Sequence, residues 1–257
     1  MAQDAQTAPQ DLGGDYLDAA IRLLTEVRRT EHGGVRTAAG ILGDAVERGA
    51  RLFVFGAGHS ALPAQDVVYR AGGLAVFNLL SVPGLVGVDV RPATLGSALE
   101  RVSGLASTVL DASPARSGDV LIVISLSGRN ELPVEMAMTA RARGLRVIGL
   151  TSTAYARETT SRHSSGSFLV DHCEVVLDNH VPVGDAELTT PGIPAPFAPA
   201  STVVTSALIQ AMVAETVGEL RSRGLEPPLL RSGNVDGGHE WNARVLSDHA
   251  DRIFYGA

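Results

Sequence analysis

The sequence predicts an α/β fold in which helices cover both faces of a central parallel sheet. Three observations support this class. Short apolar runs such as residues 51–55, typical of strands buried on both faces, recur along the chain. Stretches with helical spacing of apolar residues separate these runs. Residues 117–152 carry a complete strand–turn–helix–strand unit, which is the building block of a doubly wound sheet.

Two helices are expected ahead of the sheet. Residues 15–30 place apolar side chains on one helical stripe, and a second helix is expected over residues 35–48. The stripe consists of Tyr16, Ala19, Ala20, Leu23, Leu24 and Val27. Residues 1–14 have neither a basic flank nor an apolar run, so we expect a disordered tail rather than a signal peptide.

The α/β core is expected over residues 51–178. Its predicted elements, in chain order, are a strand at 51–55, a helix at 60–71, a strand at 74–80, the unit at 117–152 and a strand at 173–178. A chain of 257 residues with 45% hydrophobic content suits one compact domain with ample core. We therefore expect a single domain over residues 15–257, with N-terminal helices at 15–48.

The remainder, residues 179–257, is expected to add a loop, a long helix and a tail. Four prolines within 191–199 argue against regular structure there. Ser201 is expected to cap a helix that stops at Gly224. The following tail is too polar and glycine-rich to form a separate domain.

Composition excludes several classes of function. A net charge of −7 argues against nucleic acid as a partner, because a phosphate backbone requires a basic face. All 21 basic residues are arginine, which removes lysine Schiff-base chemistry and a P-loop lysine. Cys173 is the only cysteine, so no internal disulfide can form and a cytoplasmic location is expected. The sequence contains no run of about 18 apolar residues, so no membrane span is predicted.

The first glycine turn raises the choice between a dinucleotide and a smaller phosphate. Gly56, Gly58 and Ala61 satisfy the G-x-G-x-x-G/A pattern. A dinucleotide site also needs an acidic residue about 20 positions further on, at the end of the second strand. That region carries Asn78 and no Asp or Glu, and Ser60 crowds the turn. The turn therefore favours a smaller phosphate.

The second turn, "VISLSGRNE" at residues 123–131, favours a phosphate monoester. It offers the hydroxyls of Ser125 and Ser127 and the start of the next helix. The carboxyl ends of parallel strands share one edge of a sheet, where helix N-termini supply free amides. Two serine-bearing turns at that edge would form one phosphate cradle. The alternative is that these serines only cap helices.

The segments "FGAGHSA", "ISLSGRNE" and "GLRVIGLTS" resemble the sugar isomerase (SIS) domain. This resemblance implies a flavodoxin-like three-layer αβα sandwich that binds a phosphosugar through both turns. The family pattern S-x-S-G-x-T usually has Thr where this chain has Asn130, which can also donate to a phosphate. The implied binding residues are Gly58, His59, Ser60, Ser125, Ser127, Gly128, Arg129 and Asn130.

Further segments, including "TSRHSSG" at 160–166 and "SGNVDGGHEWNAR" at 232–244, resemble an actinobacterial N-acetylglucosamine-6-phosphate dehydratase. That enzyme is akin to the N-acetylmuramic acid 6-phosphate etherases. The resemblance implies a lyase that eliminates across C2 and C3 of N-acetylglucosamine 6-phosphate. The alternatives are an aldose–ketose phosphosugar isomerase and a phosphosugar sensor without turnover. No helix-turn-helix segment accompanies the domain, which argues against the sensor.

Elimination needs a base for the C2 proton and an acid for the departing hydroxyl. We expect Glu31 to be the base and His239 the acid or ring-opening catalyst, with Glu240 in support. His163 is a candidate contact to phosphate or substrate. The etherases carry their catalytic Glu ten residues after the serine, where this chain has Arg70.

No cofactor is expected, and no metal, because "DHC" at 171–173 and "DNH" at 178–180 lack the spacing of a zinc site. The apolar helix that begins at Ser201 is expected to bury a face against another subunit. We therefore expect a homodimer or larger homo-oligomer, with the pocket shared near the interface.

Overall fold

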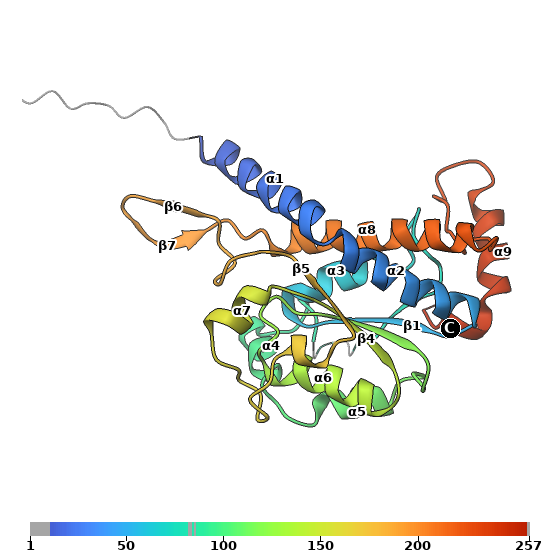
Figure 1. Ribbon diagram of the computed structural model, residues 1–257, viewed down its shortest axis with the longest axis horizontal. Coiled ribbons are helices and arrows are strands. Elements are labelled where there is room, and N and C mark those ends of the chain that lie inside the picture. Colours follow the sequence, from blue (N-terminus) through green and yellow to red (C-terminus); the bar gives the residue numbers. More distant parts are fainter. Residues whose placement is uncertain (1–10, 82–83, 85, 256–257) are drawn as a thin grey trace, which may run out of the picture.

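Five strands form one parallel sheet in the order β2-β1-β3-β4-β5. The structure is a computed structural model, and it describes residues 11–81, 84 and 86–255. Figure 1 shows the sheet between two layers of helices, which confirms the predicted αβα sandwich. The strands are β1 Leu52–Gly56, β2 Phe77–Leu79, β3 Val120–Ile124, β4 Arg146–Thr151 and β5 Val175–Asp178.

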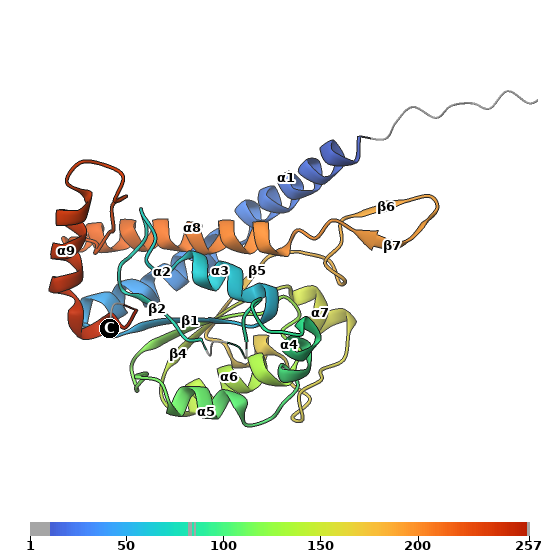
Figure 2. The ribbon, with the colours of Figure 1, turned by 180° about the vertical axis from the view of Figure 1, so that it is seen from behind.

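The helices divide between the two faces of the sheet (Figures 1 and 2). One face carries α2 His32–Glu47, α3 Ala61–Asp66 and α8 Ser201–Ser222; the other carries α4 Ala93–Leu99, α5 Leu105–Asp111 and α6 Glu131–Ala142. Successive residues of β1 point to opposite cores: Val54 packs in the first and Phe55 in the second. Burial on both faces explains why the strands read as continuous apolar runs.

Helix α1, Leu12–Thr30, begins earlier than the sequence predicts. The carboxylate of Asp11 accepts a hydrogen bond from the backbone N–H of Gly14 at 2.9 Å, which caps the helix. Residues 12–14, which the sequence predicts to be part of a disordered tail, are therefore helical. The rest of the predicted tail, residues 1–10, lies outside the described residues. The first half of α1 projects away from the sheet layers (Figure 1).

The proline-rich stretch corrects a second expectation. Strands β6 Leu188–Thr190 and β7 Ile193–Phe197 form an antiparallel hairpin, although β7 contains Pro194 and Pro196. In a two-stranded hairpin, the outer edge of each strand forms no backbone hydrogen bonds to a neighbouring strand. Proline, which cannot donate, is tolerated on that outer side.

Two predicted elements after the first turn are shorter in the structure. Helix α3 ends at Asp66 instead of residue 71, and Tyr69 beyond it adopts a positive φ of 48°. Strand β2 is reduced to three residues, while Leu74 pairs with Leu229 in an isolated bridge. Leu74, which the apolar pattern places in the second strand of the parallel sheet, thus pairs with the C-terminal segment instead.

Helix α8 is capped by a residue that the sequence did not suggest. Ser201 is its first helical residue, not its cap. One carboxylate oxygen of Asp185 accepts from the backbone N–H groups of Ala200 and Ser201, at 3.1 and 2.9 Å. An acidic side chain from the preceding loop therefore accepts hydrogen bonds from N–H groups at the start of the helix, which have no partner within the helix. The predicted stop is close: α8 ends at Ser222, and Gly224 has a φ of 75°.

The C-terminal segment folds back onto the domain at β2. Buried Asn78 donates to the carbonyl of Arg252 at 2.9 Å and accepts from the N–H of Phe254 at 2.7 Å. Helix α9, Gly238–Asp248, is held by Trp241, whose indole N–H donates to the carbonyl of Leu229 at 2.7 Å. The segment is thus an extension of the core.

Replacing Asn78 with leucine is expected to lower the free energy of unfolding by about 2–4 kcal/mol. The substitution removes the amide and leaves the buried N–H of Phe254 without its acceptor. Urea unfolding followed by Trp241 fluorescence measures the loss. Asn234→Leu, on an exposed loop, is the control and should stay within about 0.5 kcal/mol of wild type. Equal losses in both variants would contradict the anchoring role.

Candidate functional site

The sheet order brings the two predicted turns side by side. Strands β1 and β3 are neighbours, with Gly56 in register with Ile124 at their carboxyl ends. The chain leaves β1 toward α3 on one face and leaves β3 toward α6 on the other (Figure 1). This divergence creates a crevice, and ligands of open α/β sheets bind at such a crevice.

The first turn, residues 57–60, requires its glycines for backbone geometry. A Cβ on Gly56 would lie 2.1 Å from the carbonyl oxygen of Ser60, so only glycine fits there. Gly58 has a φ of 54° and donates its N–H to the carbonyl of Val86 at 2.8 Å. The Ser60 hydroxyl has no hydrogen-bond partner within the described part of the chain. It is therefore available to a ligand.

The second turn leaves several donors unused. Gly128, with a φ of 53°, donates its N–H to the hydroxyl of Ser125 at 3.2 Å. Among the described residues, no acceptor meets the backbone N–H groups of Ser127, Arg129 and Asn130, or the Ser127 hydroxyl. Helix α6 starts immediately afterwards and aims its positive end at the same place. Free amides at a helix N-terminus form a ready anion site.

The two turns meet the start of α8 in one narrow hollow. His59 and Ser60 line it from the first turn, Leu126 from the second, and Ser201 and Thr202 from α8. The hollow measures only about 10 Å³, so it shows contact between the turns rather than room for a sugar. The adjacency that the sequence predicts is thus present.

A larger hollow of about 610 Å³ opens beside the first turn. Its walls include Gly58 and His59 together with Arg91 and Glu100 from the segment around α4. This volume lies within the range of small-molecule pockets. His59 borders both hollows, so the larger one lies next to the candidate phosphate site.

Glu100 is a site residue that the sequence did not reveal. One of its carboxylate oxygens accepts from the side-chain amide of Asn130 at 2.8 Å. The other lies 3.0 Å from where a Cβ on Gly58 would stand, so this carboxylate spans the two turns. The Asn130 amide, which was expected to donate to a phosphate, is therefore engaged by Glu100.

The guanidinium of Arg129 is positively charged and has few hydrogen-bond partners within the described structure. Its Nε is buried and has no hydrogen-bond partner in the described structure. One terminal nitrogen reaches the hydroxyl of Thr160 only at 3.5 Å. A guanidinium this weakly held remains free to bind an anion, and the charge at the second turn favours one.

His163 serves the loop that covers the second turn. Its Nδ1 lies 2.7 Å from the Ser165 hydroxyl and its Nε2 lies 3.6 Å from a Glu131 carboxylate oxygen. Burial raises the pKa of Glu131, but hydrogen bonds from Ser103 and Ser164 and the charge of His163 outweigh it and lower the pKa overall. The His163 ring thus has a hydrogen-bond partner at Nδ1 and faces a carboxylate at Nε2, and both belong to the protein itself, which favours a packing role.

Glu31 lies at the same edge of the sheet as the two turns. It occupies the junction of α1 and α2, and one carboxylate oxygen accepts from the N–H of Asp178 at the end of β5 at 3.0 Å. The other lies 3.2 Å from Nε2 of His180. Strand β5 is two positions from β3, a separation of about 10 Å. In the sequence, His180 is notable only as a residue type that could bind a metal. Its proximity to Glu31 becomes visible only in the folded structure.

His239 and Glu240 lie elsewhere in the chain. Both belong to the first turn of α9, and the His239 ring lies against Gly233. Helix α9 stands at the end of the molecule opposite α7 Thr153–Glu158, which follows β4 at the carboxyl edge (Figure 1). One chain therefore does not bring these residues together with the serine turns or with Glu31.

Cys173 is unsuited to nucleophilic chemistry. Burial raises the pKa of its thiol to about 12, and the thiol donates to the carbonyl of Leu169 at 3.2 Å. We expect the folded protein to react with an aromatic disulfide reagent at pH 8 about a thousandfold more slowly than an ordinary exposed thiol. Absorbance of the released thiolate measures the rate, and protein in guanidinium chloride is the control. Rapid reaction of the folded protein would contradict this burial.

Neither a metal cluster nor a clear membrane element appears in the described structure. Within residues 11–81, 84 and 86–255, no group of three or more His, Cys, Asp and Glu side chains could hold a metal ion. One described helix, α8, is long and apolar enough to cross a membrane by length and composition alone. It packs along α2 as a core helix of the domain.

Comparison with known proteins agrees with this geometry. Residues 15–152, more than half of the chain, match the family model of the SIS domain. The chain belongs to the SIS domain family. The UPF0309 protein SCO4393 of Streptomyces coelicolor is 69% identical over 242 residues, which cover 94% of this chain and 96% of that protein. A UPF0309 protein of Geobacillus thermodenitrificans is 39% identical, covering 93% and 95%.

Solved structures share this SIS fold. The phosphoheptose isomerase GmhA of Neisseria gonorrhoeae superposes with a TM-score of 0.54 and 20% identity, over 81% of this chain and 98% of that one. The NanR protein of Vibrio vulnificus, solved with ManNAc-6P, gives a TM-score of 0.52 and 15% identity, over 93% and 69%. At these identities the likeness establishes the SIS fold.

Proposed function

We propose that this SIS protein is a phosphosugar lyase that dehydrates N-acetylglucosamine 6-phosphate by elimination across C2 and C3. The observation that carries the proposal is the pair of adjacent turns with unused hydroxyls and amides at the crevice between β1 and β3. Phosphosugar chemistry also appears in the names of the structural neighbours, a phosphoheptose isomerase and a regulator complexed with ManNAc-6P.

In this proposal the phosphate dianion binds without lysine. The hydroxyls of Ser60 and Ser127 donate to its oxygens, and the free amides of the second turn complete the cradle. Arg129 supplies positive charge at the same turn. Glu100 lines the larger hollow beside the cradle, and its carboxylate accepts from the side-chain amide of Asn130.

The reacting carbons then lie away from the cradle along the carboxyl edge. Glu31, whose carboxylate lies next to the His180 ring, takes the C2 proton. The electrons of the C2–H bond then form the C2–C3 double bond. The C3–O bond breaks, and the oxygen leaves as water after receiving a proton from Glu100 or His59 at the rim of the larger hollow. One proton leaves the sugar, one arrives, and the net change is loss of water.

The proposal assigns the protein to the cytoplasm and to a homo-oligomer. His239 and Glu240 lie on the far end of the same chain, so any contribution from them to the site must come from a second copy. Aldose–ketose isomerisation remains the competing reaction because it shares removal of the C2 proton and differs in returning a proton to C1.

NMR of the purified protein with N-acetylglucosamine 6-phosphate in deuterated water tests the proposal. Loss of the C3 oxygen with new olefinic signals supports dehydration. A ketose signal overturns it in favour of isomerisation, and unchanged substrate with measurable binding overturns it in favour of a sensor. No binding at all overturns the phosphosugar assignment itself. The unphosphorylated sugar is the control and should remain unbound and unchanged.

A further inference from the structure

A hollow of about 420 Å³ lies between α1 and the loop that follows β5, and we call it the α1 hollow. Its walls include Arg22, Thr25 and Glu26 from α1 and His180 from the loop. Arg22 and Thr25 are exposed, so the hollow opens to solvent. His180 also contacts Glu31, the carboxylate to which the proposed function gives the C2 proton. A single imidazole thus stands between the base and this solvent-filled space.

Three neighbours fix the His180 ring in this position. Its Nε2 lies 3.2 Å from one carboxylate oxygen of Glu31 and 2.7 Å from the hydroxyl of Thr30. Its Nδ1 lies 3.7 Å from a carboxylate oxygen of Asp178. The backbone of His180 adopts a positive φ of 57°, and its N–H donates to the other Asp178 oxygen at 2.8 Å. A residue other than glycine held in this conformation is often found at a functional site.

The Thr30 hydroxyl can serve both protonation states of the His180 Nε2. It lies 2.9 Å from the carbonyl of Glu26, to which it donates while it accepts from a protonated Nε2. When Nε2 has no proton, the hydroxyl can donate to the ring instead, because a hydroxyl is both donor and acceptor. An imidazolium at this place lies between the carboxylates of Glu31 and Asp178, which stabilise its charge. The neutral and the charged ring are thus both supported, as a proton carrier requires.

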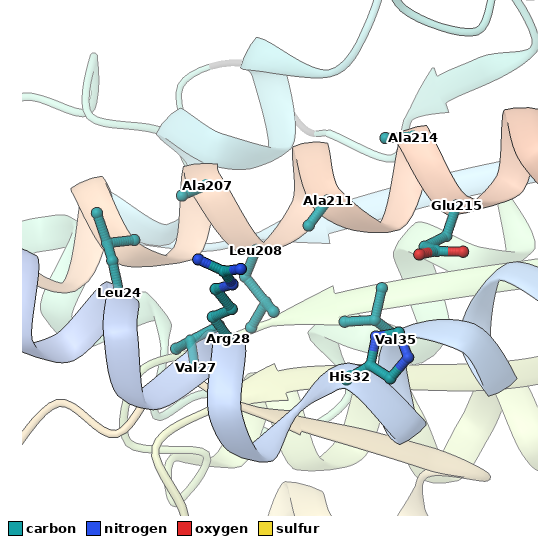
Figure 3. Close-up of a pocket in the computed structure, with 10 residues that line it drawn as sticks. All are labelled: Leu24, Val27, Arg28, His32, Val35, Ala207, Leu208, Ala211, Ala214 and Glu215. Atoms are coloured by element: carbon teal, nitrogen blue, oxygen red, sulfur yellow. The ribbon is translucent and has the colours of Figure 1, made fainter.

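The proposed elimination leaves Glu31 with a proton that it must lose before the next turnover. The Glu31 side chain is only 13% exposed, against 23% for His180. Among the described residues, His180 is the only side chain that forms a hydrogen bond with the Glu31 carboxylate. The neighbouring Arg28 and His32 face a separate hollow, lined mainly by leucine, valine and alanine (Figure 3). The polar route from the base to solvent therefore runs through His180.

We propose that His180 carries the proton taken from C2 away from Glu31 to solvent in the α1 hollow, and so restores the base. This inference rests on the proposed function. The proton passes from the Glu31 carboxyl to the lone pair of Nε2, which leaves a carboxylate and an imidazolium. The ring then gives a proton to water in the hollow and returns to the neutral form in which Nε2 can accept. Imidazole exchanges protons readily near neutral pH, so it suits this role.

Chemical rescue of His180→Asn tests the relay. Asparagine tolerates a positive φ, so the substitution keeps the backbone while it removes the ring. At low buffer concentration kcat should fall by about tenfold or more, less than for loss of a general base, because water replaces the ring in part. The ratio kcat/KM should stay nearly unchanged, since proton release follows the elimination itself. Added imidazole should restore kcat, whereas pyrazole, a ring of the same size but much weaker basicity, should not.

Two further measurements separate proton transfer from mere support of Glu31. With substrate deuterated at C2, the isotope effect on kcat should shrink in His180→Asn, because proton release then limits turnover. A displaced Glu31 would instead lower kcat/KM and preserve the isotope effect. Thr30→Val should lower kcat in the same way but more weakly. Thr25→Val is its matched control and should leave kcat unchanged, because the Thr25 hydroxyl bonds only to the carbonyl of Ile21 in the described chain.

The possible results distinguish this inference from the proposed function. Full kcat in His180→Asn at low buffer concentration overturns the relay while the proposed dehydration stands. A fall in kcat/KM that imidazole does not restore also overturns it, since the ring then only positions Glu31. A wild type that neither dehydrates N-acetylglucosamine 6-phosphate nor exchanges its C2 proton overturns the proposed function, and the relay with it. Circular dichroism confirms that each variant is folded.

Discussion

Removing the hydroxyls of Ser60 and Ser127 together is expected to weaken binding of N-acetylglucosamine 6-phosphate by about a thousandfold. Each hydroxyl would donate to a charged oxygen, and such a bond contributes about 1.5–3 kcal/mol, or roughly 10- to 100-fold in affinity. Neither hydroxyl has an internal partner in the described chain, so alanine at both positions should leave the fold intact. Isothermal titration calorimetry of the single and double alanine variants measures the loss.

Ser222→Ala is the matched control for this experiment. Its hydroxyl bonds only to the carbonyl of Glu219 at the far end of α8, so binding should be unaffected. Titration with inorganic phosphate separates loss of the cradle from loss of sugar contacts, because both ligands should weaken if the turns bind the phosphate. Full affinity in the double variant would show that the turns do not hold the ligand.

Replacing Glu31 with glutamine is expected to lower kcat by about 10²- to 10⁴-fold with little change in KM. The glutamine carbonyl can still accept from the N–H of Asp178, so the α1–α2 junction keeps its anchor while the base is lost. Exchange of the C2 proton with deuterated water reports the same step directly. It should fall in parallel with kcat.

Glu100→Gln distinguishes the two carboxylates at this edge. If Glu100 rather than His59 supplies the proton to the departing oxygen, this variant should slow loss of the C3 oxygen while the C2 proton still exchanges. The opposite pattern, with Glu31→Gln fully active and Glu100→Gln unable to exchange the C2 proton, would assign the base to Glu100. Thermal unfolding of both variants excludes a general loss of structure.

The local sequence signals predict most of the fold because they reflect local physics. Continuous apolar runs identify strands buried on both faces, as β1 and β3 show. The glycine turns were also predictable, since Gly56 and Gly128 stand where a side chain would collide with backbone or with packed neighbours. The adjacency of the turns follows from the common direction of parallel strands.

The features that sequence reasoning missed depend on distant partners. Asp185 caps α8 from a separate loop, and no local pattern marks such a cap. Glu100 belongs to a helical segment without a distinctive motif and becomes a site residue only through Asn130 and Gly58. His180 gains significance from Glu31, which lies 149 positions away in the sequence. Conversely, His239 has a site-like sequence environment but is placed at the other end of the molecule.

The short junction between α1 and α2 lies between an apolar hollow on one side and the carboxyl edge of the sheet on the other. Arg28 and His32 line this hollow, which is bounded by α1, α2 and α8, whereas the Glu31 side chain between them accepts from the N–H of Asp178 at the end of β5. A shift of α1 would therefore change the orientation of that carboxylate.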